Sequence, residues 1–349
     1  MKFIGTFLSI FILLSAIIAV VVIIGLKSLS APGPLAEDKT LIIEQGMGGG
    51  QIAGKLNQEN VISSPFLFKA AMKVMGIGTL KAGEYRFDKG IPMIDVLGKL
   101  ENGQVVQRQI TIPEGLTSHE IVRLLKKAEY LKGEIEAVPP EGSLLPETYS
   151  YSLGDTRTDK IKLMQQKMHE VLDELWDSRA ANLPVKNKEE AIILASIIEK
   201  ETGVPEERRR VAGVFVNRLN KNMPLQTDPT VIYAITKGDH KNDGKGPLGR
   251  QLLKKDLQID SPYNTYKYPG LPPGPIANPG KDSIAAALNP EEHDFIYFVA
   301  DGKGGHLFAK TLQEHNYNVA NWRKIRAEKE KKAISQDVIE EEVNEPLFE

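Results

Sequence analysis

The chain has 349 residues, of which 26% are charged and 41% are hydrophobic, values typical of a folded protein. Its length is enough for two modest domains, and its formal net charge of −2 gives no reason to expect nucleic acid as a partner. Cysteine is absent, which excludes disulfides, thiol nucleophiles and cysteine metal sites. The six histidines are scattered and form no HExxH pattern, so we predict neither a metal site nor a cofactor.

The N-terminal segment from Phe3 to Leu26 has no charged residue and is rich in aliphatic side chains. A helix of this length is about 36 Å long, enough to cross a bilayer core with some tilt. A cleaved signal peptide is the alternative, but the apolar stretch is long for one and the small residues 28–31 make a poor cleavage site. Lys2 and the amino terminus precede the span, so we expect the N-terminus inside the cell and the bulk of the chain outside.

An internal repeat follows a proline-bearing linker at residues 28–40. Segments 41–56 and 110–125 both read as an apolar strand, a glycine turn and an amphipathic helix, and a looser copy covers residues 83–100. In the second copy, Thr117 and Glu120 have the spacing of a capping box. Such units are similar to the LysM-type modules that bind glycan chains.

A mainly helical region with long loops comes next. Helices are expected at 160–175, 191–202, 207–220 and 283–288, and a buried strand is expected at 295–300. The predicted fold is therefore α+β, in five parts. These are an N-terminal stretch with a transmembrane helix (1–27), the linker (28–40), a LysM-like subdomain (41–150), a mainly helical domain with a short sheet (151–325) and a charged tail (326–349).

The segment LASIIEKETG at residues 194–203 carries two candidate chemical groups, Glu199 and Glu201. Each glutamate continues an apolar face of the helix, and the two lie about 200° apart around the helix axis. A carboxyl group in apolar surroundings has a raised pKa and can hold a proton that it then donates. Periodicity alone does not choose between the two, and glutamates near helix ends are more commonly solvated.

Polar and aromatic residues gather in the loops that follow. Gln226 and Thr227 precede Asp228, which we expect to cap a helix that begins with Pro229. Tyrosines and asparagines in such loops suit a sugar-binding cleft, because aromatic rings pack on pyranose faces and amides pair with hydroxyl groups.

Six short motifs now occur in order: EKET from Glu199, NRL from Asn217, LQTDPT from Leu225, YNTY from Tyr263, GLPPG from Gly270 and FVADG from Phe298. Together they resemble the endolytic transglycosylase family called MltG or YceG-like, over roughly residues 40–325. The resemblance implies that the first glutamate of EKET, here Glu199, is the catalytic residue. Candidate substrate-binding residues at the motif positions are Asn217, Gln226, Thr227, Tyr263, Asn264 and Thr265.

The resemblance also implies a function. A family member would act at the inner cell membrane, as a lyase that cuts the MurNAc-β-1,4-GlcNAc bond of nascent peptidoglycan strands and leaves 1,6-anhydroMurNAc ends. A single glutamate would serve as acid and then as base. Peptidoglycan glycan strands and the peptidoglycan synthases of the cell-wall machinery would be its partners.

Other classes of function remain open from the sequence. The chain is alternatively a non-catalytic glycan-binding scaffold of the envelope, or a muramidase that uses water and leaves reducing ends. A nucleotide-binding loop at residues 48–53, which fits G-x-G-x-x-A, is less favoured because the second repeat copy has no glycine run at that place.

Overall fold

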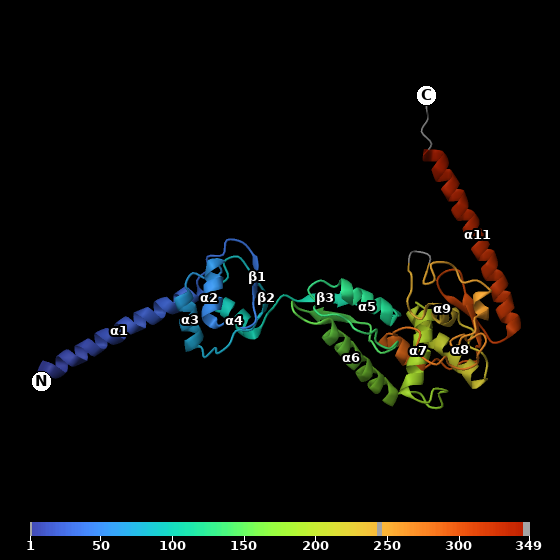
Figure 1. The fold of residues 1–349 in the computed structure, drawn as a ribbon, viewed down its shortest axis with the longest axis horizontal. Helices are drawn as coiled ribbons and strands as arrows, with labels where there is room; N and C mark the ends of the chain where they lie inside the picture. Colours follow the sequence, from blue (N-terminus) through green and yellow to red (C-terminus); the bar gives the residue numbers. More distant parts are fainter. Residues whose placement is uncertain (1, 243–245, 345–349) are drawn as a thin grey trace, which may run out of the picture. The chain divides into compact units, whose positions relative to one another are not determined.

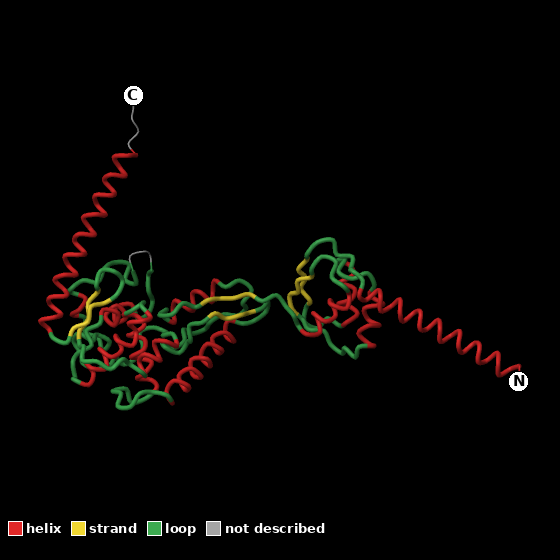
Figure 2. The backbone as a smooth tube through the Cα atoms, turned by 180° about the vertical axis from the view of Figure 1, so that it is seen from behind, coloured by secondary structure: helices red, strands yellow, loops and turns green. Residues whose placement is uncertain are grey.

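The computed structural model describes residues 2–242 and 246–344, and side chains for residues 10–242 and 246–328. It divides into two compact units. Unit 1 comprises residues 1–110 with the short segments 129–132 and 150–155, and unit 2 comprises the remainder. The model mixes many helices with three two-stranded sheets, which confirms the α+β class (Figures 1 and 2).

Unit 1 begins with the long apolar helix α1, Lys2–Ser30. The most apolar 18-residue window within residues 10–30 of α1 has a mean hydropathy of 2.9 and is not buried, so this helix is long and apolar enough to cross a membrane. No extended tether separates α1 from the module behind it. The backbone of Gly33 and Leu35 is hydrogen-bonded to Gly90, and Leu35 is only 5% exposed.

The rest of unit 1 is a strand–helix–helix–strand module followed by a further helix. Its elements are β1 (Lys39–Ile43), α2 (Gly49–Gln58), α3 (Pro65–Val74), β2 (Gly83–Phe87) and α4 (Met93–Asn102). β1 and β2 are antiparallel, with Leu41 opposite Tyr85. Alternate strand residues face the helices, so that Ile43, Tyr85 and Phe87 are at most 1% exposed.

Unit 2 carries most of the helices. They are α5 (Ser118–Lys127), α6 (Arg157–Asp177), α7 (Lys188–Glu201), α8 (Arg208–Asn220), α9 (Asp228–Thr236), α10 (Lys281–Leu288) and α11 (Leu312–Asn344). Two short 3-10 turns, Pro205–Glu207 and Asp256–Gln258, lie in its loops. Strands β5 (Tyr297–Ala300) and β6 (His306–Ala309) form an antiparallel hairpin. The third sheet pairs β3 (Arg108–Thr111) with β4 (Thr148–Tyr151), and the boundary between the units passes through it.

Helix α7 is the centre of the unit 2 core. Eight consecutive residues, 191–198, are buried against α8 and α10, since a helix surrounded by other elements has no solvent face. Asn187 caps its first turn by accepting a hydrogen bond from the Glu190 N–H. The sequence placed this helix at 191–202, and the structure begins it three residues earlier.

The second repeat copy packs in unit 2, which differs from the boundary expected at residue 150. Its capping box is confirmed: Thr117 accepts from the Glu120 N–H, and the Glu120 carboxylate accepts from the Thr117 N–H. The turn before α5 is hydrogen-bonded to the loop before α10, through the Gly115 N–H and the Asn278 carbonyl at 3.0 Å. These bonds are the reason that residues 111–128 belong to unit 2 rather than to the module of unit 1.

Gly213 is a close-packed position in α8. A Cβ atom there would lie 2.4 Å from the Glu291 carbonyl oxygen and 2.6 Å from His293 Nε2, so the neighbouring loop would have to move. We expect Gly213→Ala to destabilise unit 2 by about 1–3 kcal/mol, as overpacking does. Chemical denaturation followed by circular dichroism measures this. The matched control is Gly54→Ala in α2, where no atom lies within 4 Å. There, the better helix propensity of alanine should stabilise the fold by about 0.5–1 kcal/mol. Equal effects of the two substitutions on stability would contradict the packing argument.

Candidate functional site

Helix α7 separates its two glutamates in space. Glu199 lies on the side of α10, where its Oε2 accepts a hydrogen bond from the Gly280 N–H at 2.9 Å. Its Oε1 is 3.9 Å from the Arg208 guanidinium, and its side chain is 6% exposed. The carboxyl group is therefore held between a backbone donor and a cation.

Glu114, in the turn of the second repeat, completes this first cluster. Its carboxylate is 3.7 Å from Arg208, and burial together with the charge of Glu199 raises the pKa of Glu114. The Glu114 carboxyl lies directly over Gly280, where a Cβ would come within 1.8 Å of it. Asp282 also contacts Arg208, at 3.3 Å. The cluster thus shares one arginine among three carboxyl groups.

Glu201 lies on the other side of α7 and lines a cavity of about 580 Å³. Burial raises the pKa of Glu201 to about 7. Its Oε1 accepts a hydrogen bond from the Thr227 hydroxyl, and its Oε2 forms none with any described residue. The geometry therefore gives Glu201 what a proton donor needs: a group protonated near neutral pH, with one oxygen open to a cavity.

The walls of this cavity combine polar and aromatic side chains. Gln226, Thr227 and Asp228 form the polar wall, from the loop before α9 and its first residue. The aromatic wall consists of Phe215, Tyr266, Tyr297 and Phe298, and the start of α11 adds Leu312, His315 and Asn316. Rings beside amide and hydroxyl groups are the composition expected of a carbohydrate subsite.

Arg218 fixes the polar wall. Its guanidinium donates to the carbonyls of Pro224, Leu225 and Ile296 at 2.7–3.0 Å. These bonds stabilise Gln226 in a left-handed backbone conformation, φ +54°, which an ordinary residue seldom adopts. The turn directs Thr227 toward Glu201.

Buried threonines hold the same loop from behind. Thr265 accepts from the Thr227 N–H at 3.1 Å and lies 2.8 Å from the Thr230 hydroxyl. Thr227, not Asp228, is the N-cap residue of α9, so the predicted cap was wrong by one position. Asp228 Oδ1 instead accepts from the Tyr266 hydroxyl at 2.7 Å.

Of the six predicted substrate-binding residues, the structure brings two to the Glu201 cavity, Gln226 and Thr227. Asn217 donates to the carbonyls of residues 293 and 295, and Asn264 to those of residues 257 and 259, so both fix loops. Asn264 and Thr265 are at most 1% exposed. Contact of these two side chains with sugar remains a prediction, and their visible role is to shape the cavity.

Tyr263 packs its ring against Tyr233, beside Glu141, and lies outside the lining of the cavity. Tyr266 and Tyr297 do line it, and sequence reasoning did not single them out as site residues. Tyr266 belongs to the same YNTY motif, three residues after Tyr263. The signal that could have selected it was proximity to the LQTDPT loop, which periodicity does not reveal.

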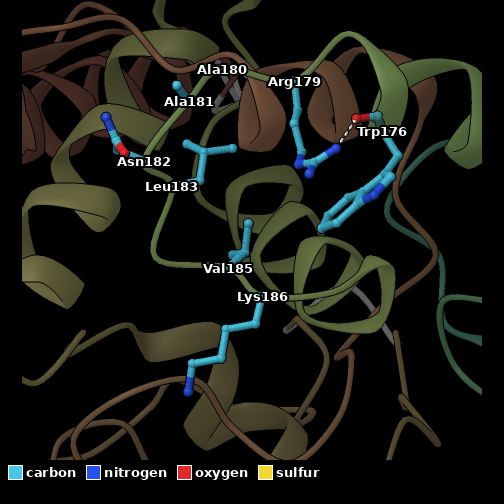
Figure 3. Close-up of a pocket in the computed structure, with 8 residues that line it drawn as sticks. All are labelled: Trp176, Arg179, Ala180, Ala181, Asn182, Leu183, Val185 and Lys186. Atoms are coloured by element: carbon cyan, nitrogen blue, oxygen red, sulfur yellow. Dashed lines mark hydrogen bonds between the residues drawn. The ribbon is translucent and has the colours of Figure 1, made fainter.

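A second cavity, of about 380 Å³, lies between the end of α6 and the start of α7 (Figure 3). Arg179 stacks over the Trp176 ring there, 4.1 Å from its centroid. No carboxyl group lines this cavity, so it offers no group for acid catalysis. Among the residues that the structure describes, no three His, Asp or Glu side chains come together as a metal site.

Glu141 is the other carboxyl with a pKa near 7, raised by burial. Its Oε1 accepts from the Ser118 N–H at 2.8 Å, and its Oε2 is enclosed without a partner. Glu141 also lines a cavity, of about 350 Å³, but its free oxygen is enclosed, so Glu141 is a poorer proton donor than Glu201.

The fold and the acid-bearing cavity define a candidate glycan-cleaving enzyme, and comparison with known proteins specifies its family. The family model described as YceG-like matches residues 41–321, and the chain belongs to this family. The endolytic murein transglycosylase of Bacillus subtilis strain 168 is 36% identical over 306 residues, which cover 78% of this chain and 82% of that protein. The protein of the same name from Streptococcus pneumoniae strain D39 is 30% identical over 330 residues, which cover 80% of this chain and 58% of that protein.

A solved structure, the 2.6 Å crystal structure of a YceG-like protein from Listeria monocytogenes, is 33% identical in sequence. It aligns over 81% of this chain and 99% of that one, with a TM-score of 0.47. The predicted family and the predicted enzyme class, lytic transglycosylase, are confirmed by the family match and the curated relatives.

The raised pKa of Glu141 predicts a pH dependence of stability. The folded-state pKa of about 7 exceeds the ordinary value of 4.5, so the stability that this group contributes is present below pH 4.5 and is lost as the pH rises through 7. Glu141→Gln removes the titration. We expect the free energy of unfolding of the variant, relative to the original protein, to rise by about 2–3 kcal/mol from pH 5 to pH 8. Urea denaturation at both pH values measures this difference, and a constant difference would contradict the burial of a titrating Glu141.

Proposed function

We propose that this protein is an endolytic lytic transglycosylase of peptidoglycan, and that Glu201 is its general acid and base. The observation that supports this choice is a cavity-lining carboxyl whose pKa lies near 7 and which is surrounded by a wall of tyrosines and amides. The curated relatives are named endolytic murein transglycosylases, which supports peptidoglycan as the substrate. Glu199, the residue that the family resemblance selected, is the competing assignment.

In the proposed reaction, protonated Glu201 donates its proton to the glycosidic oxygen between MurNAc C1 and GlcNAc O4. The C1–O4 bond breaks, and the GlcNAc leaves with a hydroxyl group. The Glu201 carboxylate then removes the proton from the C6 hydroxyl of the same MurNAc, whose oxygen bonds to C1 and closes a 1,6-anhydro ring. Because the nucleophile is already part of the sugar, no water is consumed and the entropic cost is small.

A water-using muramidase is the second candidate, and one observation favours it. Asp228 lines the same cavity as Glu201, and its negative charge contributes to the raised pKa of Glu201. Two carboxyl groups in one cavity are what a hydrolase needs. Asp228 is already hydrogen-bonded to Tyr266, which favours a supporting role over that of a base that activates water.

Cleavage is proposed to take place at the membrane. Helix α1 would remain as a single span with the N-terminus in the cytoplasm, and unit 2 would act on nascent strands outside. The direct packing of α1 against α4 supports an uncleaved anchor, because removal of α1 would expose part of the unit 1 core. The β1–α2–α3–β2 module is proposed to bind glycan in the manner of LysM modules, and peptidoglycan synthases are proposed as partners.

The first test separates the two glutamates. Glu201→Gln keeps the shape of the side chain and removes the proton, so we expect release of anhydro-ended fragments from peptidoglycan to fall at least ~10²-fold, the scale of general acid catalysis. Glu199→Gln is the matched control on the same helix turn, and we expect a smaller loss from it. Mass spectrometry of the products measures both rates.

If Glu199→Gln abolishes the reaction while Glu201→Gln retains it, then Glu199 is the catalytic residue and the assignment to Glu201 is wrong. If the products have reducing ends that incorporate oxygen from labelled water, the protein is a muramidase and not a transglycosylase. In that case Asp228→Asn should also abolish cleavage. If the original protein leaves peptidoglycan intact, both enzymatic assignments are wrong and a non-catalytic glycan-binding scaffold is the remaining interpretation.

The second test uses pH. Since only protonated Glu201 donates, kcat/KM should fall as the pH rises above about 7. The Thr227 hydroxyl stabilises the carboxylate by donating to it, so its removal should raise the pKa of Glu201 further. We therefore expect Thr227→Val to move the alkaline limb of the pH–rate profile to higher pH. Thr236→Val in the last turn of α9 is the control, and an equal shift there would contradict the role of Thr227.

A further inference from the structure

The outer face of helix α3 in unit 1 is apolar and basic, with no described residue packed over it. Phe66 is 79% exposed and Val74 is 88% exposed, large fractions for such side chains, and Met75 beyond the helix end is 48% exposed. The opposite face of the same helix supplies Phe68 and Met72 to the core.

Lysines accompany these apolar side chains. Lys69 lies three residues after Phe66 and Lys73 four residues after Lys69, so all three share the outer face. Both lysines are exposed, and neither forms an ion pair with another described residue. Residues 60–83 contain three lysines and no acidic residue, so nothing in this stretch neutralises the charge.

The position of α3 relates this face to α1. Figures 1 and 2 show α3 at the margin of unit 1 from which α1 departs, whereas β1 and β2 lie at the far margin. Because the core lies on the inner side of α3, its outer face is directed away from the module. Helix α1 packs on α4 and Leu29 packs on the core, so α1 and α3 belong to the same compact unit.

We propose that α3 is a membrane-surface helix, whose Phe66, Val74 and Met75 enter the interface of the bilayer that α1 spans. Lys69 and Lys73 then lie at the level of the lipid phosphates and attract anionic headgroups. This inference rests on the proposed anchoring by α1. Continuity with the span, the lysines and the missing acidic residues favour a lipid surface over a protein partner.

The chain has no cysteine, so a cysteine introduced into the full-length chain is the only site that a thiol-reactive label modifies. Phe66→Cys, Ile42→Cys and Ile24→Cys would each carry a nitroxide label in vesicles of phosphatidylethanolamine and phosphatidylglycerol. Ile42 is the matched control, an apolar residue of β1 that is 46% exposed at the far margin of unit 1. Ile24 lies in α1 and reports the span.

Electron paramagnetic resonance measures collisions of each label with oxygen, which concentrates in lipid, and with a nickel chelate, which stays in water. We expect labels at 66 and 24 to collide more with oxygen than with nickel, and the label at 42 to show the reverse. Neutralising both lysines, in Lys69→Gln with Lys73→Gln, should reduce the lipid-inserted population at position 66 roughly tenfold or more at low salt.

A label at position 66 that is as open to nickel as the label at 42 would overturn the proposal. Shielding of position 66 only after a second protein is added would also overturn it and assign the face to that protein. A label at position 24 exposed to nickel would show that the anchor itself is absent. That outcome is independent of peptidoglycan cleavage, so it can be told apart from a failure of the proposed catalysis.

Discussion

Burial of helix α7 is the constraint on which unit 2 depends. Eight consecutive residues of this helix are at most 7% exposed, so its direction and rotation are fixed by packing. Its last turn then presents two carboxyl groups in different directions, one to the loop before α10 and one to the cavity beside α9. A rigid helix at the base of a cavity holds an acid in place more accurately than a loop would, because the rotamers around it are locked.

The two glutamates show how environment distinguishes identical groups on one helix. Glu199 is held by the Gly280 N–H and faces Arg208, contacts that tie α7 to neighbouring segments. Glu201 has one donor, Thr227, and otherwise lies among protein atoms that disfavour its charge. A clamp of hydrogen bonds from Arg218 builds the turn that supplies this donor. The environment of Glu201 in the cavity therefore depends on the Arg218 hydrogen bonds as well as on Thr227.

Much of this fold could be predicted from the sequence. The apolar N-terminal helix, the helices that flank EKET and the capping box of α5 all follow from local patterns, and the structure has them within a few residues. The motif order also identified the family. Local patterns could not choose between Glu199 and Glu201, since the choice depends on which side of α7 meets a cavity. They also missed that Asn264 and Thr265 are buried supports, because hydrogen bonds to distant backbone leave no periodic signal.

The junction between α1 and unit 1 has a further consequence. The helix continues to Ser30 and meets packed residues within a few positions, so no flexible tether separates the two. Each residue added to a helix turns whatever follows by about 100° and advances it by about 1.5 Å. The length of α1 therefore sets the direction in which each face of the module points relative to the start of the helix.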